Sequence, residues 1–277
     1  MMLRIASHVI PDIYNEQLIA FDVRDTDVLA PQVLATKGPE VGTMAVSFQI
    51  SAGRRLIRGE TFLVRRYLQA AADCFGAMFL GTGVEGPVTY RFEGRAIEGP
   101  GMPEFYGAQT LNWLHAFCLA SALRRQDVLQ ILDGYDRAKL KKAPTGSFDL
   151  YAIALVEGMR LFRRNDPGYV ALLEEAERMS RPENLRIATP SVIGRFRALI
   201  PLVFSIARND QAGFDKACED AVKAHKAFYS RGKRKEDPDG LLAYHAAGIA
   251  AIGVDRGLVY NIDSEYTPRW LVYNEVP

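Results

Sequence analysis

Apolar residues recur at helical spacing through most of this chain. Over Glu60–Leu80 they return every three or four positions, which places them on one face of a helix. Gly81 and Gly83 supply the end of that helix. The same spacing predicts a helix over Glu104–Arg124 and a shorter one over Val128–Tyr135.

A sequence pattern recurs three times in the second half: an apolar helix end, one or two arginines, an amide, an aspartate and a second helix. The aspartates are Asp127, Asp166 and Asp210, separated by 39 and 44 residues. Because an aspartate at an N-cap accepts from free backbone amides, each is expected to cap the second helix of a helical hairpin. The pattern predicts stacked antiparallel hairpins, each burying its apolar face on the next. These hairpins cover Glu104–Tyr135, Phe148–Ser180 and Thr189–Tyr229.

The first helix of the third hairpin, Ser191–Arg208, is apolar nearly all round, which is typical of a central buried helix. Pro201 lies within it and lacks the N–H that would continue the hydrogen-bond ladder. We therefore expect a kink in this helix.

The N-terminal part, residues 1–55, is the least regular. Weak helical patterns occur at Ile13–Phe21 and Val28–Leu34, and Met44–Ile50 suits either a strand or the start of a helix, of which the helix is favoured. The stretch Val84–Pro103 is rich in glycine and proline and predicts a small β-hairpin within 84–99, turning at Glu93-Gly94. A loop of this length is either a surface excursion or an interaction site.

Composition sets limits on the class of protein. The 277 residues are 48% hydrophobic and 24% charged, with a net charge of +1, so no global field favours nucleic acid or an anionic membrane. The cysteines are few and widely spaced, which indicates buried, reduced thiols. The N-terminus lacks a signal-peptide pattern, and the longest apolar run, Ala198–Ala207, is too short to span a bilayer. We expect one all-α domain over residues 1–277, located in the cytoplasm.

No pattern for catalysis, cofactor binding or metal binding is found in the sequence. The histidines His8, His115, His225 and His245 lack metal-ligand spacing, and phosphate-loop and nucleophile-elbow motifs are absent from the sequence. We predict no catalytic residue, no cofactor and no metal site, and hence a protein that is not an enzyme. A site formed by residues that converge in space, using His225 or His245, is the alternative.

The most distinctive stretch lies near the C-terminus. A helix end with a His-Lys-x-x-Tyr sequence precedes a polar loop, an alanine-rich helix, an Asp-Arg-Gly end and a Tyr-x-Pro sequence. This order resembles the tail of the bacterial polymorphic-toxin immunity proteins of immunity protein family 49. The resemblance implies an all-α, non-enzymatic protein that binds and neutralises a toxin encoded by a neighbouring gene. The residues that carry it are His225, Lys226, Tyr229, Asp239, Gly240, Asp255, Arg256, Gly257, Tyr266 and Pro268.

Local chemistry assigns these residues to the fold rather than to toxin contact. Asp237 followed by proline suits the start of a helix, and Gly257 suits a left-handed helix end. Gly248 and Gly253 cost helix propensity, which indicates close approach of another helix. His225 and Tyr229 share a face, where a hydrogen-bonded structural histidine is favoured over a catalytic pair. The aromatic tail after Gly257 is expected to pack over the bundle.

Two functions therefore fit the sequence. The first is an immunity protein that binds a toxin acting in the cytoplasm, without nucleic acid or membrane as partner. Its candidate contact regions are the loops Val84–Pro103, Arg137–Gly146 and Arg231–Asp239, the second of which is expected to be a solvated loop. The second is a helical-repeat scaffold that binds another protein or a peptide.

Overall fold

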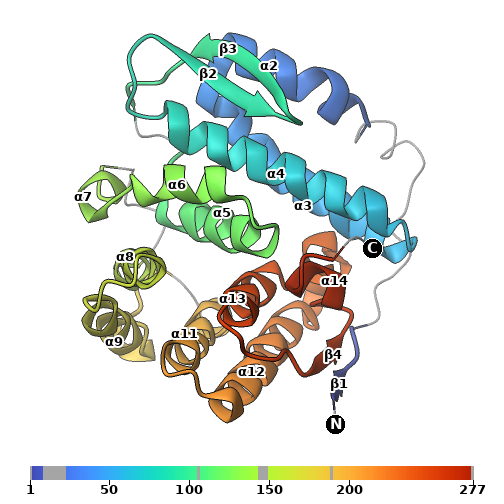
Figure 1. Ribbon diagram of the computed structural model, residues 1–277, viewed down its shortest axis with the longest axis vertical. Coiled ribbons are helices and arrows are strands. Elements are labelled where there is room, and N and C mark those ends of the chain that lie inside the picture. Colours follow the sequence, from blue (N-terminus) through green and yellow to red (C-terminus); the bar gives the residue numbers. More distant parts are fainter. Residues whose placement is uncertain (1, 9–22, 105–106, 143–148, 188–189, 276–277) are drawn as a thin grey trace.

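Helices make up most of the described residues (Figure 1). The computed structural model describes residues 2–8, 23–104, 107–142, 149–187 and 190–275. The strands are β1 (Leu3–Ile5), β2 (Pro87–Phe92), β3 (Arg95–Pro100) and β4 (Ile262–Ser264). The α-helices are α2 (Ala30–Lys37), α3 (Gly42–Ile57), α4 (Thr61–Gly81), α5 (Thr110–Ala122), α6 (Gln126–Asp133), α7 (Arg137–Leu140), α8 (Tyr151–Arg163), α9 (Tyr169–Met179), α10 (Pro190–Arg197), α11 (Leu199–Ala207), α12 (Gln211–Tyr229), α13 (Tyr244–Asp255) and α14 (Arg269–Val272). Short π and 3-10 turns are η1 (Asp25–Leu29), η2 (Gly38–Val41), η4 (Pro182–Asn184), η5 (Gly232–Glu236) and η6 (Pro238–Leu241). The all-α prediction is confirmed.

Antiparallel helix pairs are the building unit. The pairs α3–α4, α5–α6, α8–α9 and α11–α12 pack along their lengths, and a continuous hydrophobic core runs through them. Helix α13 packs against α5 and α11, which ties the C-terminal part to the middle of the chain (Figure 1). The stacked hairpins predicted from the sequence are thus present, with α13 as an additional layer.

The N-terminal part is helical from residue 23 onward, whereas the described residues 2–8 contain the short strand β1. Met44–Ile50 lies within α3, so the favoured helix was correct, and Val28–Leu34 falls in η1 and α2. The predicted segment Ile13–Phe21 lies outside the described residues. Strand β1 pairs in parallel with β4, so the start of the chain lies beside its C-terminal region.

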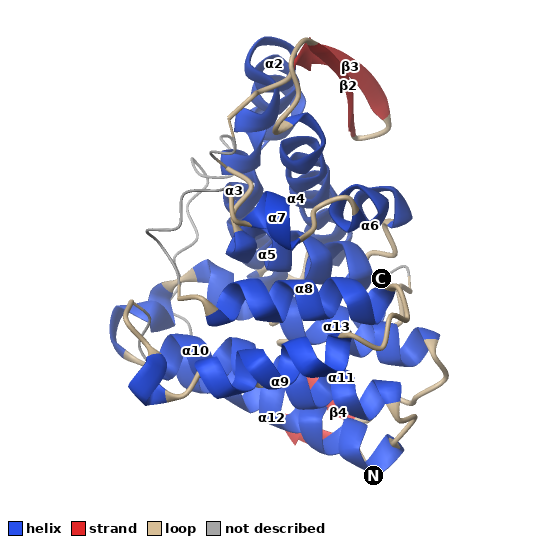
Figure 2. Cartoon of the chain, turned by 90° about the vertical axis from the view of Figure 1, so that its left-hand side faces the viewer, coloured by secondary structure: helices blue, strands red, loops and turns tan. Residues whose placement is uncertain are grey.

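The β-hairpin predicted within Val84–Pro103 is confirmed. Strands β2 and β3 pair antiparallel, and Glu93 and Gly94 form the turn with φ of 45° and 77°. Two successive residues with positive φ are typical of the tight hairpin turn that matches strand twist. The hairpin lies on α2, where a Cβ at Gly99 would fall 1.9 Å from the Leu34 carbonyl oxygen. Figure 2 shows the hairpin at one end of the molecule and β4 near the other.

Two predictions for the middle of the chain were wrong. The helix expected from Glu104 begins at Thr110, because the Gln109 backbone is extended and leads into α5 from a loop. The segment Arg137–Gly146, expected to be a solvated loop, contains the short helix α7, which Asp136 caps through its carboxylate. Residues 143–146 of that segment lie outside the described part of the chain.

Pro201 interrupts its helix as expected. The helix predicted over Ser191–Arg208 is divided into α10 and α11 at Ala198. A proline at position 201 cannot donate to the carbonyl four residues earlier, so the ladder is broken close to this point. Helix α11 is largely buried, with Leu202, Val203 and Ile206 in the core.

The repeated pattern marks a shared helix ending, with a register that differs from the predicted one. Residues 124, 165 and 209 all adopt positive φ, of 54°, 54° and 51°. The next residue in each case donates its N–H to a carbonyl five positions earlier, which defines a Schellman ending. The equivalent positions are therefore Arg125, Asp166 and Asp210, and Asp127 is displaced from them by two residues.

Only one of the three predicted caps is formed as expected. Asp210 is the N-cap of α12, and its carboxylate accepts from the Gly213 N–H at 2.9 Å. Asp166 accepts from the Gly168 N–H, so it caps the turn before α9 rather than the helix itself. Asp127 lies inside the first turn of α6 and pairs with Arg125, so its predicted role as N-cap was wrong.

Replacing Asp210 with alanine should lower the free energy of unfolding by about 1 kcal/mol, because the first turn of α12 loses its side-chain acceptor. Asp210→Asn keeps an acceptor oxygen and should retain most of the stability. Urea denaturation followed by circular dichroism measures both. Equal stability of the alanine variant and the wild type would contradict the capping role.

The C-terminal segment covers the bundle as predicted. Tyr260, Tyr266 and Leu271 are buried, and α14 packs on α13. Asp237 caps η6 through the Asp239 N–H rather than α13, which starts at Tyr244, so that helix start was predicted too early. Gly257, with φ of 95°, ends α13 as expected.

Candidate functional site

Five of the ten residues that carry the family resemblance meet around the His225 ring; they are His225, Tyr229, Asp239, Gly240 and Tyr266, here called the motif cluster. His225 Nε2 donates to the Gly240 carbonyl oxygen at 2.9 Å. Its ring centroid lies 4.7 Å from that of Tyr229 and 5.1 Å from that of Tyr266. Burial lowers the pKa of His225 to about 3, so the ring is neutral at physiological pH.

A second polar chain leads from the motif cluster to Arg195. The Arg195 Nη1 donates to the Tyr229 hydroxyl at 2.8 Å, and that hydroxyl donates to Asp239 Oδ2 at 3.2 Å. The guanidinium carbon also lies 4.5 Å from the Phe228 ring centroid, within cation–π range. Burial raises the pKa of Asp239, opposed by the charge of Arg195. The cluster therefore joins α10, α12 and η6 through enclosed polar contacts.

Tyr266 of the motif cluster and the motif residue Lys226 contact the N-terminal segment. The Tyr266 hydroxyl accepts the His8 N–H at 2.7 Å and lies 2.6 Å from His8 Nδ1. Lys226 Nζ donates to the Ala6 carbonyl oxygen at 2.7 Å. Pro268 is the N-cap of α14, just after the Tyr266 segment.

The remaining motif residues lie at the opposite end of α13. Asp255 pairs with Arg124 at 2.9 Å, and Arg124 also donates to the Val272 carbonyl oxygen. Arg256 donates to Asn165 Oδ1 at 3.0 Å and lies over the Phe162 ring. Arg124 and Asn165 are the positive-φ residues of the helix endings, so Asp255 and Arg256 bridge α13 to two of the hairpins.

A buried histidine pair lies close to the motif cluster and could not be foreseen from the sequence. The ring centroids of His115 and His245 lie 4.7 Å apart, and Tyr244 lies 4.2 Å from His245. Burial lowers the pKa of His115 to about 3 and that of His245 well below its ordinary value. The two histidines are 130 positions apart in the sequence, and nothing in that stretch signals that α5 and α13 are neighbours.

The described residues include no cluster of three or more histidine, cysteine, aspartate or glutamate side chains that could hold a metal ion. Cys74, Cys118 and Cys218 are free and buried, and burial raises the pKa of each thiol. A buried thiol with a raised pKa is a poor nucleophile, because the thiolate is the reactive form. In the part of the chain that is described, no helix is long and apolar enough to cross a membrane.

A depression lined by charged side chains lies beside the β-hairpin. Two adjoining hollows of about 520 and 210 Å³ form one groove between β2, α4 and α6, here called the hairpin groove. Helix α4 forms its floor, and β2 and α6 form its walls. Residues along it include Gln69, Asp73, Leu80, Arg91, Asp127 and Ile131.

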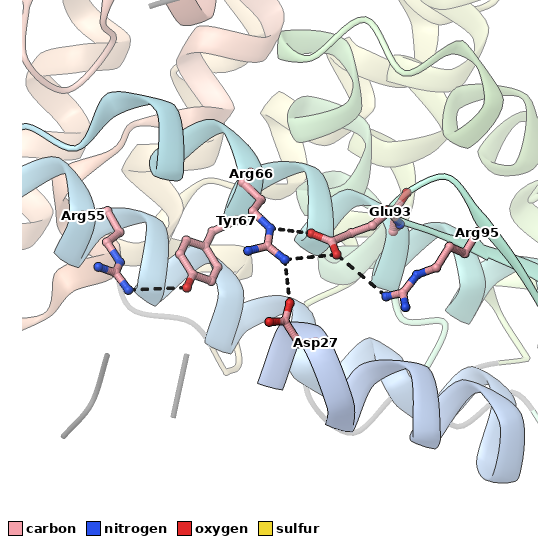
Figure 3. Close-up of polar contacts among 7 residues, drawn as sticks. Asp27, Arg55, Arg66, Tyr67, Glu93 and Arg95 are labelled. Carbon is pink, nitrogen blue, oxygen red and sulfur yellow. Dashed lines mark hydrogen bonds and ion pairs between the residues drawn. The ribbon is translucent and has the colours of Figure 1, made fainter. Parts of the chain in front are cut away.

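Ion pairs hold the β-hairpin against α4. Figure 3 shows Arg66 between Glu93 and Asp27, with Nε and Nη2 each 2.7 Å from a carboxylate oxygen. Arg95 points to the same Glu93 carboxylate, at 3.9 Å. Glu93 also donates its backbone N–H to Asp73 Oδ2 at 2.8 Å. The turn of the hairpin is therefore fixed to α4 by charged contacts on both its side chain and its backbone.

Asp73 links the floor of the groove to α6. Its Oδ1 lies 2.6 Å from Arg125 Nη2, which is also 2.6 Å from Asp127 Oδ2. Burial raises the pKa of Asp73, and Arg125 opposes the shift. Hydrogen bonds from Arg125 lower the pKa of Asp127. At neutral pH these contacts favour a fixed, charged groove wall.

A second hollow, of about 650 Å³, lies between η2, α3 and the end of α4. Its lining includes Met78, Met102 and Asn112, next to the loop that precedes α5. It is more apolar than the hairpin groove. Among the described residues, the loop Arg231–Asp239 forms η5 and η6 and leaves Lys233 and Lys235 exposed.

The structure is that of an all-α protein built of helical hairpins, and buried polar clusters join these hairpins to one another. The family described as Immunity protein 49 matches residues 60–271, from the start of α4 to α14. The chain therefore belongs to the Immunity protein 49 family, which confirms the resemblance seen in the C-terminal stretch. A search of curated proteins and a search of solved structures each gave no match.

Proposed function

We propose that this protein binds a bacterial toxin encoded by a neighbouring gene and neutralises it in the cytoplasm, without catalysis. Membership in the Immunity protein 49 family carries this proposal, since an immunity protein implies a toxin partner. The matched range includes the motif cluster, the hairpin groove and all ten motif residues. Burial of His225, Tyr229 and Tyr266 supports a structural role for the motif, which leaves toxin contact to the exposed loops and grooves.

Co-expression tests the proposal. The product of the adjacent toxin gene, produced alone, should arrest growth, and production of this protein with it should restore growth. An affinity tag on this protein should recover the toxin in the same fraction. An unrelated helical protein in place of this one is the control and should give neither effect. Failure of both rescue and co-purification would contradict the proposal.

The repeated Schellman endings at Arg124, Asn165 and Asn209 favour a second candidate, a helical-repeat scaffold for another protein. The two candidates differ in gene neighbourhood. A toxin gene next to this one supports the immunity role, whereas an unrelated operon supports the scaffold.

A further inference from the structure

The hairpin groove has the shape of a binding site for a protein segment. Its floor follows one face of α4 from Arg66 to Leu80, a rise of roughly 20 Å at 1.5 Å per residue. An extended segment of about six residues has the same length. The groove is polar at the Arg66 end and apolar at the Leu80 end, where Val128 and Ile131 complete the wall.

Arg91 differs from the other arginines of the groove because its side chain is not paired with a carboxylate in the described part of the chain. Arg66 is engaged by Glu93 and Asp27, and Arg125 is engaged by Asp73 and Asp127. Arg91 is exposed and lines both halves of the groove, and none of the described residues forms a hydrogen bond or ion pair with its side chain. Its guanidinium is free to bind a carboxylate in the bidentate geometry that arginine favours.

The neighbouring acids restrict what can bind. Asp73, Glu93 and Asp127 line the same groove, so a polyanion such as nucleic acid would meet repulsion from three carboxylates. A single carboxylate directed at Arg91 avoids most of that cost. Leu80, exposed at 36%, offers an apolar contact at the other end of the groove.

The walls of the hairpin groove are held in place by contacts within the protein itself. Asp73 holds the hairpin turn through the Glu93 N–H and holds α6 through Arg125. Contacts that fix both walls to the floor reduce the ordering cost of association.

From these observations we infer that the hairpin groove is where the toxin docks, through a segment that presents a carboxylate beside an apolar side chain. The inference rests on the proposed immunity function. Arg91 binds the carboxylate, and Leu80 and Ile131 receive the apolar group.

The test is the dissociation constant for the purified product of the adjacent toxin gene, measured by calorimetry at two salt concentrations. Arg91→Glu should weaken binding at least about 30-fold, because attraction becomes repulsion at the centre of the site. The wild type should lose affinity with added salt more steeply than the variant. Arg91→Lys keeps the charge but lacks the planar guanidinium, so its dissociation constant should lie between those of the wild type and Arg91→Glu.

Matched controls keep this result specific. Arg181→Glu makes the same charge change at an exposed arginine before η4, away from the groove, and should leave the dissociation constant within about twofold of the wild type. Leu80→Ala should weaken binding about tenfold, whereas Ile187→Ala, at a residue exposed at 53%, should not.

The outcomes separate the two proposals. The docking site would be overturned if the wild type binds tightly and Arg91→Glu has the same dissociation constant. It would also be overturned if Arg181→Glu weakens binding as much as Arg91→Glu does. Either result would leave the proposal of toxin binding intact. Absence of binding by the wild type would overturn both.

Discussion

Gly248→Ala should lower the free energy of unfolding by at least about 3 kcal/mol, a large share of the stability of an ordinary domain. A Cβ at position 248 would lie 2.0 Å from the Cys118 carbonyl oxygen and 2.5 Å from its carbon. Both atoms belong to the backbone of α5, which is buried and cannot move aside as a flexible side chain could. The two helices must therefore separate, and the core contacts between them are lost.

Urea denaturation followed by circular dichroism measures this change, with Gly194→Ala as the matched control. Position 194 lies inside α10, and a Cβ there meets nothing within 4 Å. Alanine should raise helix propensity at that site, so the control should gain up to about 1 kcal/mol. Similar stability of Gly248→Ala and the wild type would show that α13 and α5 do not cross as closely as described.

Acid should destabilise the protein well before its ordinary carboxylates titrate. His115, His225 and His245 are buried and neutral, with pKa values of about 3 for the first two and well below the ordinary value for the third. In the unfolded chain each has a pKa of about 6.5. Between these values the unfolded state binds more protons, so stability is present above pH 6.5 and is lost as the pH falls.

The loss of stability on acidification scales with the number of buried histidines. Each buried histidine removes about 1.4 kcal/mol of stability per pH unit below 6.5, so three remove roughly 3–4 kcal/mol between pH 7 and pH 5.5. Arg195 lowers the pKa of all three, whereas the raised pKa values of Asp73 and Asp239 act in the opposite direction on stability. The histidines outnumber those acids, so we expect a net loss.

The measurement is the free energy of unfolding in urea at several pH values from 7.5 to 5.5. His245→Gln should make the slope shallower by about 1.4 kcal/mol per pH unit, because one proton fewer is taken up on unfolding. A free energy of unfolding that stays constant across this range would contradict the assignment of three buried neutral histidines.

Local sequence patterns predicted where most helices lie, but not which helices pack against one another. The apolar stripe of α4, the kink near Pro201 and the turn at Glu93-Gly94 all depend on nearby residues, and the sequence is sufficient for them. The register of the repeat was wrong because Arg125 occupies the place that aspartate takes in the other two hairpins. A helix ending is defined by backbone conformation, which residue identity at one position only partly determines.

The candidate sites also depend on packing between helices that are distant in the sequence. Gly248 indicated close approach of a helix, but only the fold identifies α5 as that helix. The Val84–Pro103 segment was a candidate contact region, yet its groove also requires Asp73 from α4 and Arg125 at the N-cap of α6. Those side chains come together through tertiary packing, and no spacing in the sequence encodes it.

We propose that this protein neutralises a toxin by binding it directly. The most direct measurement is the activity of the purified toxin as purified protein is added in increasing molar ratio. Direct binding predicts that toxin activity falls in proportion and is abolished near one equivalent, with a stable complex in gel filtration. Full toxin activity in the presence of a molar excess would contradict the claim, as would complete loss of activity at a small fraction of one equivalent.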